Sequence, residues 1–296
     1  MNTTDLQTIP GQEHVKRALE VAAAGEHHIL LIGPSELAAQ LGSTLPTLLP
    51  LTLIPPAVKA TTPLFITADP AARDSAWFGV FTHGRLHYGA VGHAHNGVLL
   101  ANLTTAKPPR LERLRIILDE RRAVASTRWQ DYEIPARFQL VATAERCACG
   151  GYDPINQACP TCTPKKIAAY RAKRSLNGRT AIVVQVGAIR ARENTRQGEP
   201  SAAVRARVVA ARTRQAERRR GHPSYYMVNA DLRLEDIRDF CPLDAASKSL
   251  ADAAQRQLNL SIANYLTMLR LARTIADLAG ADKIGPAHLA EAIQYL

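Results

Sequence analysis

Four short apolar runs, separated by segments with helical spacing, constrain the fold of this chain most strongly. Residues 11–28 and 110–122 place apolar side chains three and four positions apart, as amphipathic helices do. The runs that read as buried strands are HILLIG (28–33), NGVLLANL (96–103), FQLVATA (138–144) and AIVVQVGAI (181–189). Strands that alternate with helices predict an α/β fold, with a parallel sheet covered by helices on both faces.

The pattern changes after residue 189. RARENTRQGEPS is polar, which predicts a linker at residues 191–200. Nearly every later segment has helical spacing, including SAAVRARVVAARTRQAERRR and SIANYLTMLRLARTIADLAG. We therefore predict an α/β domain at 1–190 and a small helical domain at 201–296.

Net charge and composition limit the partners and the cellular location that we expect for this chain. The net charge is +11, which suits a polyanionic partner such as DNA, although a solvated basic surface explains the charge equally well. The sequence has no apolar run of 18 residues and no secretory signal, so we expect no membrane span and a cytoplasmic location.

Four of the five cysteines form one cluster in CACGGYDPINQACPTC, with the spacing C-x-C-x₉-C-x₂-C. Two close pairs separated by a short loop are typical of a tetrathiolate zinc site, in which both pairs reach one tetrahedral ion. No ligand position is left open, so we predict structural zinc in an insertion at about 147–164. The ligands would be Cys147, Cys149, Cys159 and Cys162.

Several segments carry a family resemblance. GQEHVKRALEVAAAGEHHILLIGP, AHNGVLL, YEIPARFQLVATAERCACG, CTPKKIAAYR, AAVRARVVAAR, LRLARTIADLAG and IGPAHLAEAIQY occur in one order. From about residue 11 to 296, the chain resembles magnesium-chelatase-like AAA+ ATPases, specifically the ComM branch.

The resemblance implies an AAA+ αβα sandwich of the P-loop type, a helical lid, assembly into a ring, and work driven by ATP. ComM-type proteins act on branched DNA, and chelatase relatives drive metal insertion into a porphyrin. We do not expect the protease-like N-terminal domain that ComM proteins usually carry.

The phosphate-binding motif of the family, GPPGTGKT, is altered here. It corresponds to Gly33, Pro34, Ser35, Glu36, Leu37, Ala38, Ala39 and Gln40. The lysine that neutralises phosphate has become Ala39, and the hydroxyl that holds Mg²⁺ has become Gln40. Glu36 adds a carboxylate where a phosphate would lie, and like charges repel at contact distance.

The other catalytic positions implied by the resemblance are also replaced. Asn102 and Leu103 stand for the Walker B Asp and Glu, which bind Mg²⁺ and activate water. Glu145 stands for the sensor 1 Asn, Ala181 for the arginine finger and Ala263 for the sensor 2 arginine. We found no other G-K-[ST] motif in the sequence.

These replacements predict a folded pseudo-ATPase that is not an enzyme and binds no ATP–Mg²⁺. It would act as an adaptor or structural subunit, in a ring with an active AAA+ paralogue or beside DNA. Two alternatives stay open: an ATPase with residual activity, and a stand-alone module that binds nucleic acid. The candidate DNA contacts are Lys165, Lys166, Arg171, Lys173 and Arg174, next to the cysteine cluster.

The histidines give no metal pattern. His27, His28, His83, His87, His93 and His95 lack a consistent spacing with carboxylates, so we interpret them as structural side chains with satisfied hydrogen bonds.

Overall fold

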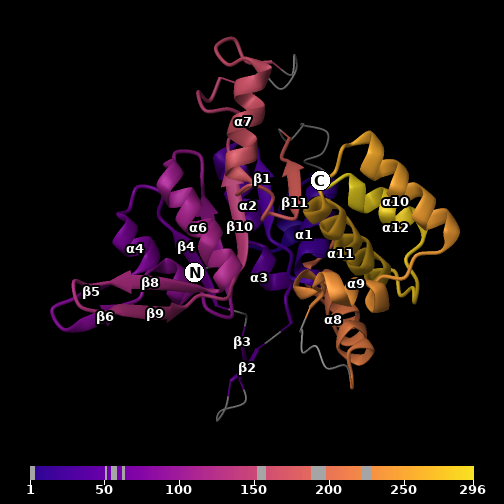
Figure 1. Ribbon diagram of the computed structural model, residues 1–296, viewed down its shortest axis with the longest axis horizontal. Helices are drawn as coiled ribbons and strands as arrows, with labels where there is room; N and C mark the ends of the chain where they lie inside the picture. The colour runs from indigo at the N-terminus through magenta and orange to yellow at the C-terminus, as the bar shows by residue number, and fades with distance from the viewer. Residues whose placement is uncertain are drawn as a thin grey trace.

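A five-stranded parallel sheet forms the centre of the computed structural model (Figure 1). The structure describes residues 4–50, 52–54, 59–61, 64–151, 158–187, 198–221 and 228–296. The strand order is β11 (Ile182–Gln185), β1 (Ile29–Ile32), β10 (Gln139–Ala144), β7 (Val98–Asn102) and β4 (Phe65–Ala68). The predicted α/β fold is confirmed. The sequence had indicated all of these strands except β4, which follows a proline-rich stretch.

Alternate side chains of the sheet enter two hydrophobic clusters, one on each face. Ile29 and Leu31 pack with α1 (Glu13–Gly25), α2 (Ser35–Gly42) and α3 (Leu45–Leu48). Leu30 and Ile32 lie in the second cluster, with α4 (Asp74–Phe78), α5 (Ala90–His93) and α6 (Pro108–Glu120). This alternation follows from the two-residue period of a strand, and burial on both faces explains why the strands are apolar throughout.

Three antiparallel hairpins accompany the sheet: β2 (Thr52–Ile54) with β3 (Lys59–Thr61), β5 (Val80–Thr82) with β6 (Arg85–His87), and β8 (Arg122–Ser126) with β9 (Asp131–Pro135). The last two lie together at one end of the molecule, where Phe81 stacks on Tyr132 with 4.2 Å between the rings (Figure 1). The helix predicted at 110–122 ends at Glu120, because Arg121 takes a left-handed conformation and Arg122 begins β8.

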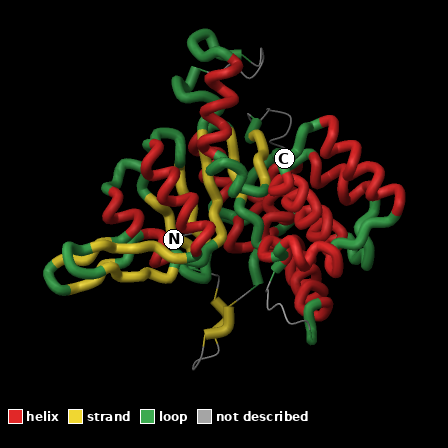
Figure 2. The backbone as a smooth tube through the Cα atoms, in the orientation of Figure 1, coloured by secondary structure: helices red, strands yellow, loops and turns green. Residues whose placement is uncertain are grey.

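The C-terminal part of the described chain is almost entirely helical, as Figure 2 shows. Its helices are α8 (Ser201–Arg218), α9 (Leu234–Phe240), α10 (Ala245–Gln257), α11 (Ile262–Leu278) and α12 (Pro286–Ile293), with a short 3₁₀ turn, η3 (Asn229–Asp231). Residues of α8 and α11 share one hydrophobic cluster with α1 and β1. The lid is therefore packed directly on the sheet domain.

A buried ionic network ties α8 to α11. The Asp277 carboxylate is fully buried and accepts hydrogen bonds from Arg218 and from Asn229 Nδ2, the latter at 2.8 Å. Arg273 pairs with the same carboxylate at 3.0 Å and is itself buried. Removing a buried carboxylate of this kind is strongly destabilising, because its guanidinium partners are then left without a counter-charge.

Two expectations from the sequence have partial outcomes. Most of the predicted linker at 191–200 lies outside the described residues, so the domain boundaries stay a prediction. In the part of the chain that the structure describes, no helix combines the length and the apolar character needed to cross a membrane.

Candidate functional sites

The carboxyl edge of the sheet brings together the phosphate-loop, Walker B and sensor 1 positions. The backbone N–H of Gly33 donates to the Ala144 carbonyl at 2.9 Å, and that of Leu103 donates to the Thr143 carbonyl at 2.8 Å. The Glu145 N–H donates to Thr104 Oγ1 at 3.1 Å. These positions follow β1, β7 and β10, whose parallel arrangement places their ends at one edge.

The segment in the place of the phosphate loop is largely helical. Helix α2 begins at Ser35, only two residues after Gly33, and the Ala38 N–H donates to the Pro34 carbonyl at 2.9 Å. A phosphate loop instead turns a series of backbone N–H groups toward its ligand. Gly33 is needed here for packing, because a Cβ at this position would lie 2.5 Å from the Val186 carbonyl oxygen.

The side chains at this edge do not fit ATP–Mg²⁺. Glu36 is exposed in the first turn of α2, and a Glu145 carboxylate oxygen lies 3.4 Å from Ser35 Oγ, so two carboxylates flank the phosphate position. Asn102 Oδ1 accepts the Thr104 N–H at 2.9 Å, and Leu103 is completely buried. Ala39 is half-buried and Gln40 exposed, and neither can supply a cation.

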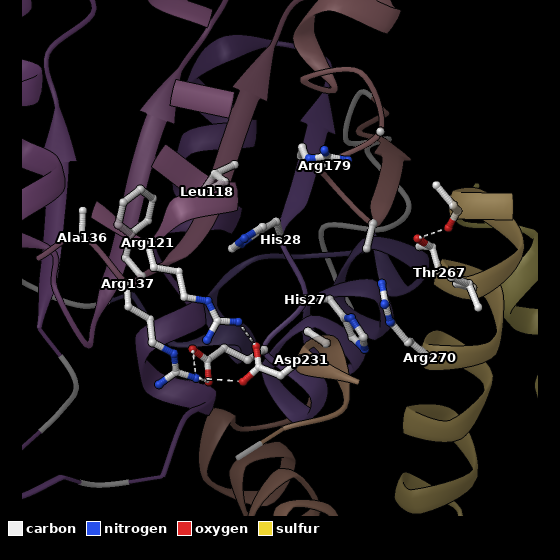
Figure 3. Close-up of a pocket in the computed structure, with 17 residues that line it drawn as sticks. His27, His28, Leu118, Arg121, Ala136, Arg137, Arg179, Asp231, Thr267 and Arg270 are labelled. Atoms are coloured by element: carbon white, nitrogen blue, oxygen red, sulfur yellow. Dashed lines mark hydrogen bonds and ion pairs between the residues drawn. The ribbon is translucent and has the colours of Figure 1, made fainter. Parts of the chain in front are cut away.

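Ala181 and Ala263 lie at the opposite, amino edge of the sheet. Ala181 directly precedes β11, and Ala263 is in the first turn of α11. Both line a cavity of about 300 Å³ between the amino ends of the strands and the lid (Figure 3). Of the positions where the resemblance places catalytic groups, these two are therefore separated from the phosphate loop by the length of the sheet.

Four arginines line this amino-edge cavity: Arg121, Arg137, Arg179 and Arg270. Two carboxylates also line it. Asp231 pairs with Arg121, and Arg137 reaches Glu26 at 3.2 Å and Asp231 at 3.3 Å, as the dashed lines in Figure 3 show. Arg179 pairs with Asp119 at 2.5 Å. Arg270 has no ion pair or hydrogen bond from its side chain within the described parts of the chain.

Two adjacent histidines meet the same cavity, and both are neutral at pH 7. Burial lowers the pKa of His27 to about 3 and that of His28 to about 4. His27 Nε2 lies 2.8 Å from Thr274 Oγ1, and His28 Nδ1 accepts the backbone N–H of Leu140 at 3.0 Å. His27 matches our interpretation of a satisfied structural histidine. His28 lines the cavity, and its second ring nitrogen, Nε2, has no hydrogen-bond partner among the described residues. The sequence did not reveal this arrangement.

The four clustered cysteines converge as predicted. Their Sγ atoms all lie within 4.8 Å of one another, with Cys149 3.4 Å from Cys147, 3.2 Å from Cys159 and 3.4 Å from Cys162. Four thiolates around a tetrahedral Zn²⁺ at about 2.3 Å require sulfur–sulfur separations of about 3.8 Å, so the set fits such an ion with little adjustment.

The protonation of these thiols depends on their surroundings. Burial raises the pKa of Cys147 to about 12, and the hydrogen bond from Thr161 lowers that of Cys149 to about 6. A bound divalent cation would hold all four sulfurs as thiolates.

Helix α7 (Pro164–Arg174) follows the cysteine cluster and carries the predicted DNA contacts. Lys165, Lys166 and Lys173 are exposed and Arg171 is half-buried. Arg174 is only 9% exposed and donates to the Thr104 carbonyl at 2.9 Å. The prediction for Arg174 is therefore corrected: its guanidinium faces the carboxyl edge of the sheet and is not presented to solvent.

Profiles of known protein families match almost the whole chain. The profile described as magnesium chelatase, subunit ChlI, matches residues 5–62 and 64–194, and the profile of the ChlI C-terminal region matches residues 198–296. This chain belongs to the magnesium chelatase family. The resemblance seen in the sequence is confirmed, and with it the AAA+ class of the fold.

Relatives within the magnesium chelatase family align along nearly the whole chain. The competence protein ComM of Haemophilus influenzae is 32% identical over 99% of this chain, and YifB of Escherichia coli is 32% identical over 98%. The chain spans 60% of the length of each of these curated relatives. A full-length MCM homologue from Methanopyrus kandleri shares the fold, with a TM-score of 0.56 and 14% identity over 97% of this chain and 55% of its own.

Proposed function

We propose that this magnesium chelatase family member neither binds ATP–Mg²⁺ tightly nor hydrolyses ATP, and that it works as an adaptor or structural subunit. The observation that carries the proposal is the start of α2 at Ser35, which makes the phosphate-loop segment helical. A helical turn directs its N–H groups along its axis and cannot encircle a triphosphate.

The remaining groups at the carboxyl edge support the same proposal. Hydrolysis needs a carboxylate for Mg²⁺ and a group that orients the attacking water. Asn102 is neutral and engaged by the Thr104 N–H, and the apolar Leu103 is buried in the core. Glu36 and Glu145 would repel the phosphates of an incoming nucleotide.

Nucleotide titration tests the proposal. The purified chain should give no saturable heat with ATP in the presence of Mg²⁺ and release no phosphate above the buffer rate. Circular dichroism on the same sample confirms that the protein is folded. Affinity of about 1 μM together with turnover would overturn the proposal and support the residual-ATPase alternative.

For the cysteine cluster we propose a structural Zn²⁺. The four converging sulfurs support it, and four protein ligands would leave no open position for catalysis. Elemental analysis should find about one zinc per chain. Replacing Cys162 with Ser should release the metal, whereas replacing the isolated and buried Cys241 with Ser should retain it. A metal-free wild-type protein purified without chelators would exclude the site.

For DNA we propose contact through the exposed lysines of α7. Helix α7 stands out from the body of the molecule (Figure 1), and Lys165 and Lys166 in its first turn are exposed. Binding to phosphates should weaken steeply as salt rises. K165Q/K166Q should lower affinity and reduce the salt slope, while K248Q, an exposed change on α10, should do neither. Salt-insensitive binding would contradict this proposal.

As a partner we propose an active AAA+ paralogue, with which this chain would form a mixed oligomer. The match of both family profiles supports it, since together they cover the sheet domain and the lid of a chelatase subunit. Mass measurement in solution, alone and mixed with a catalytically complete family member, should reveal a mixed oligomer. A strict monomer in both samples would favour the stand-alone nucleic-acid module.

A further inference from the structure

We propose that the amino-edge cavity binds the phosphate group of a small ligand through the Arg270 guanidinium and the Nε2–H of His28. Arg270 enters from α11, and His28 directly precedes β1 (Figure 3). This cavity lies across the sheet from the altered phosphate loop, so the inference does not depend on the fate of ATP there.

Arg270 supplies the unbalanced charge. Arg121 and Arg137 are paired with Asp231 and Glu26, and Arg179 is paired with Asp119. Arg270 Nε is buried without a hydrogen-bond partner among the residues described, and burial lowers the pKa of this side chain. A guanidinium held in a partly buried position without a direct hydrogen bond or ion pair is unfavourable, so an anion that enters the cavity and pairs with it is stabilised there.

His28 supplies a neutral donor whose direction is fixed. Because its Nδ1 accepts the backbone N–H of Leu140, that nitrogen carries no proton. Burial keeps the ring neutral at pH 7, so its single proton must be on Nε2. An N–H donor that lines the same cavity as a guanidinium can bind an anionic oxygen, and a protonated ring nitrogen cannot bind a metal cation.

The size and charge of the cavity select the ligand. A volume of about 300 Å³ is at the lower limit for small-molecule sites, which suits a phosphate or a phosphate monoester. Glu26 and Asp231 face the same space, and their charges disfavour a triphosphate. The geometry therefore points to a single phosphate group, free or carried by a small molecule such as a nucleoside monophosphate.

The test is an equilibrium titration of the chain of residues 1–296, without Mg²⁺, using inorganic phosphate and, in a separate arm, AMP. Both should bind saturably and compete with each other. R270Q should weaken each by about tenfold or more, the usual effect of removing one charge-assisted hydrogen bond. R256Q, an exposed change on α10, should leave both affinities unchanged.

A second measurement keeps the inference testable if R270Q does not fold. In nitrogen NMR of the wild-type protein, the free His28 ring should show its proton on Nε2, and phosphate should shift that resonance. Equal affinity for phosphate and AMP would assign recognition to the phosphate alone, whereas tighter AMP binding would add its nucleoside to the site. Absence of saturable binding, or binding with an unperturbed His28, would overturn the inference.

Discussion

The two edges of the same sheet differ in charge. At the carboxyl edge, Glu36 and Glu145 place two carboxylates beside the segment that resembles a phosphate loop, where α2 begins at Ser35. At the amino edge, Ala181 and Ala263 lie where the resemblance places arginines, and Arg179 and Arg270 line the same cavity. The contrast teaches that one sheet can place two carboxylates at the altered phosphate-loop segment and a cluster of arginines at its opposite edge.

The largest effect we expect concerns the support of the amino edge. D277A would leave the guanidinium groups of Arg218 and Arg273 without their buried counter-charge, and should lower the free energy of unfolding by about 3–5 kcal/mol. Denaturant unfolding followed by circular dichroism measures this. E217A, at an exposed position on α8 next to Arg218, is the control and should change stability little. Equal effects of the two changes would show that the network does not hold the lid.

Acid should weaken the amino edge as well. His27 and His28 have folded-state pKa values below the unfolded value of about 6.5, so the unfolded chain binds protons first as the pH falls. Their contribution is present above the unfolded pKa of about 6.5 and is lost as the pH falls toward about 4 for His28 and about 3 for His27. Between pH 7 and 5 each histidine should remove about 2 kcal/mol of stability.

H27Q isolates this contribution, because glutamine keeps a donor near Thr274 but does not titrate in this range. The variant should lose about 2 kcal/mol less than the wild type between pH 7 and 5 in denaturant titrations. Parallel pH profiles for the two proteins would contradict the assignment.

A smaller effect is expected at Gly33, at the carboxyl edge of the sheet, where a substitution tests whether this glycine is needed for packing. G33A would bring a Cβ to 2.5 Å from the Val186 carbonyl oxygen and should destabilise the fold by about 1–3 kcal/mol. G84A is a useful control, since a Cβ at that hairpin glycine meets no atom within 4 Å, although its positive φ adds local strain. Thermal denaturation of both variants would show whether the contact with Val186 dominates.

The smallest effect is expected for the variant A39K, which should gain no affinity for ATP–Mg²⁺. A39K restores the lysine of the family motif, but the segment around it remains helical and Asn102 and Leu103 are unchanged. Calorimetry with ATP and Mg²⁺ should therefore show no saturable binding by the variant. Appearance of tight binding would mean that the charge of one residue, and not the backbone conformation, distinguishes the two edges.

The sequence predicted the parts of this molecule that depend on local periodicity. The strands β1, β7, β10 and β11 are apolar runs, and the paired spacing of the cysteines anticipated their convergence. Strands β5 and β6 were missed because each has three residues and Arg85–His87 has little apolar character. Such strands are defined by their pairing partners, which a local pattern does not contain.

The candidate sites also differ in how far a local sequence pattern predicts them. The altered motif at Gly33–Gln40 was visible because its residues are contiguous. The amino-edge cavity was not, because His28, Arg179 and Arg270 come from distant segments and have no common spacing. The burial of Arg174 was also hidden, since its acceptor is the backbone carbonyl of Thr104 and backbone groups leave no trace in side-chain identity.

The hydrogen bond from the Val183 N–H to the Tyr295 carbonyl, at 3.0 Å, has a consequence for the order of events during synthesis. Strand β11 is made more than a hundred residues earlier, yet this donor has to wait for Tyr295 to leave the ribosome. Until then the edge strand of the sheet is open along the nascent chain. The residues that follow α12 are therefore the last of the described chain to reach this edge, and chaperones that shield unpaired strand edges would be most useful to this protein in that interval.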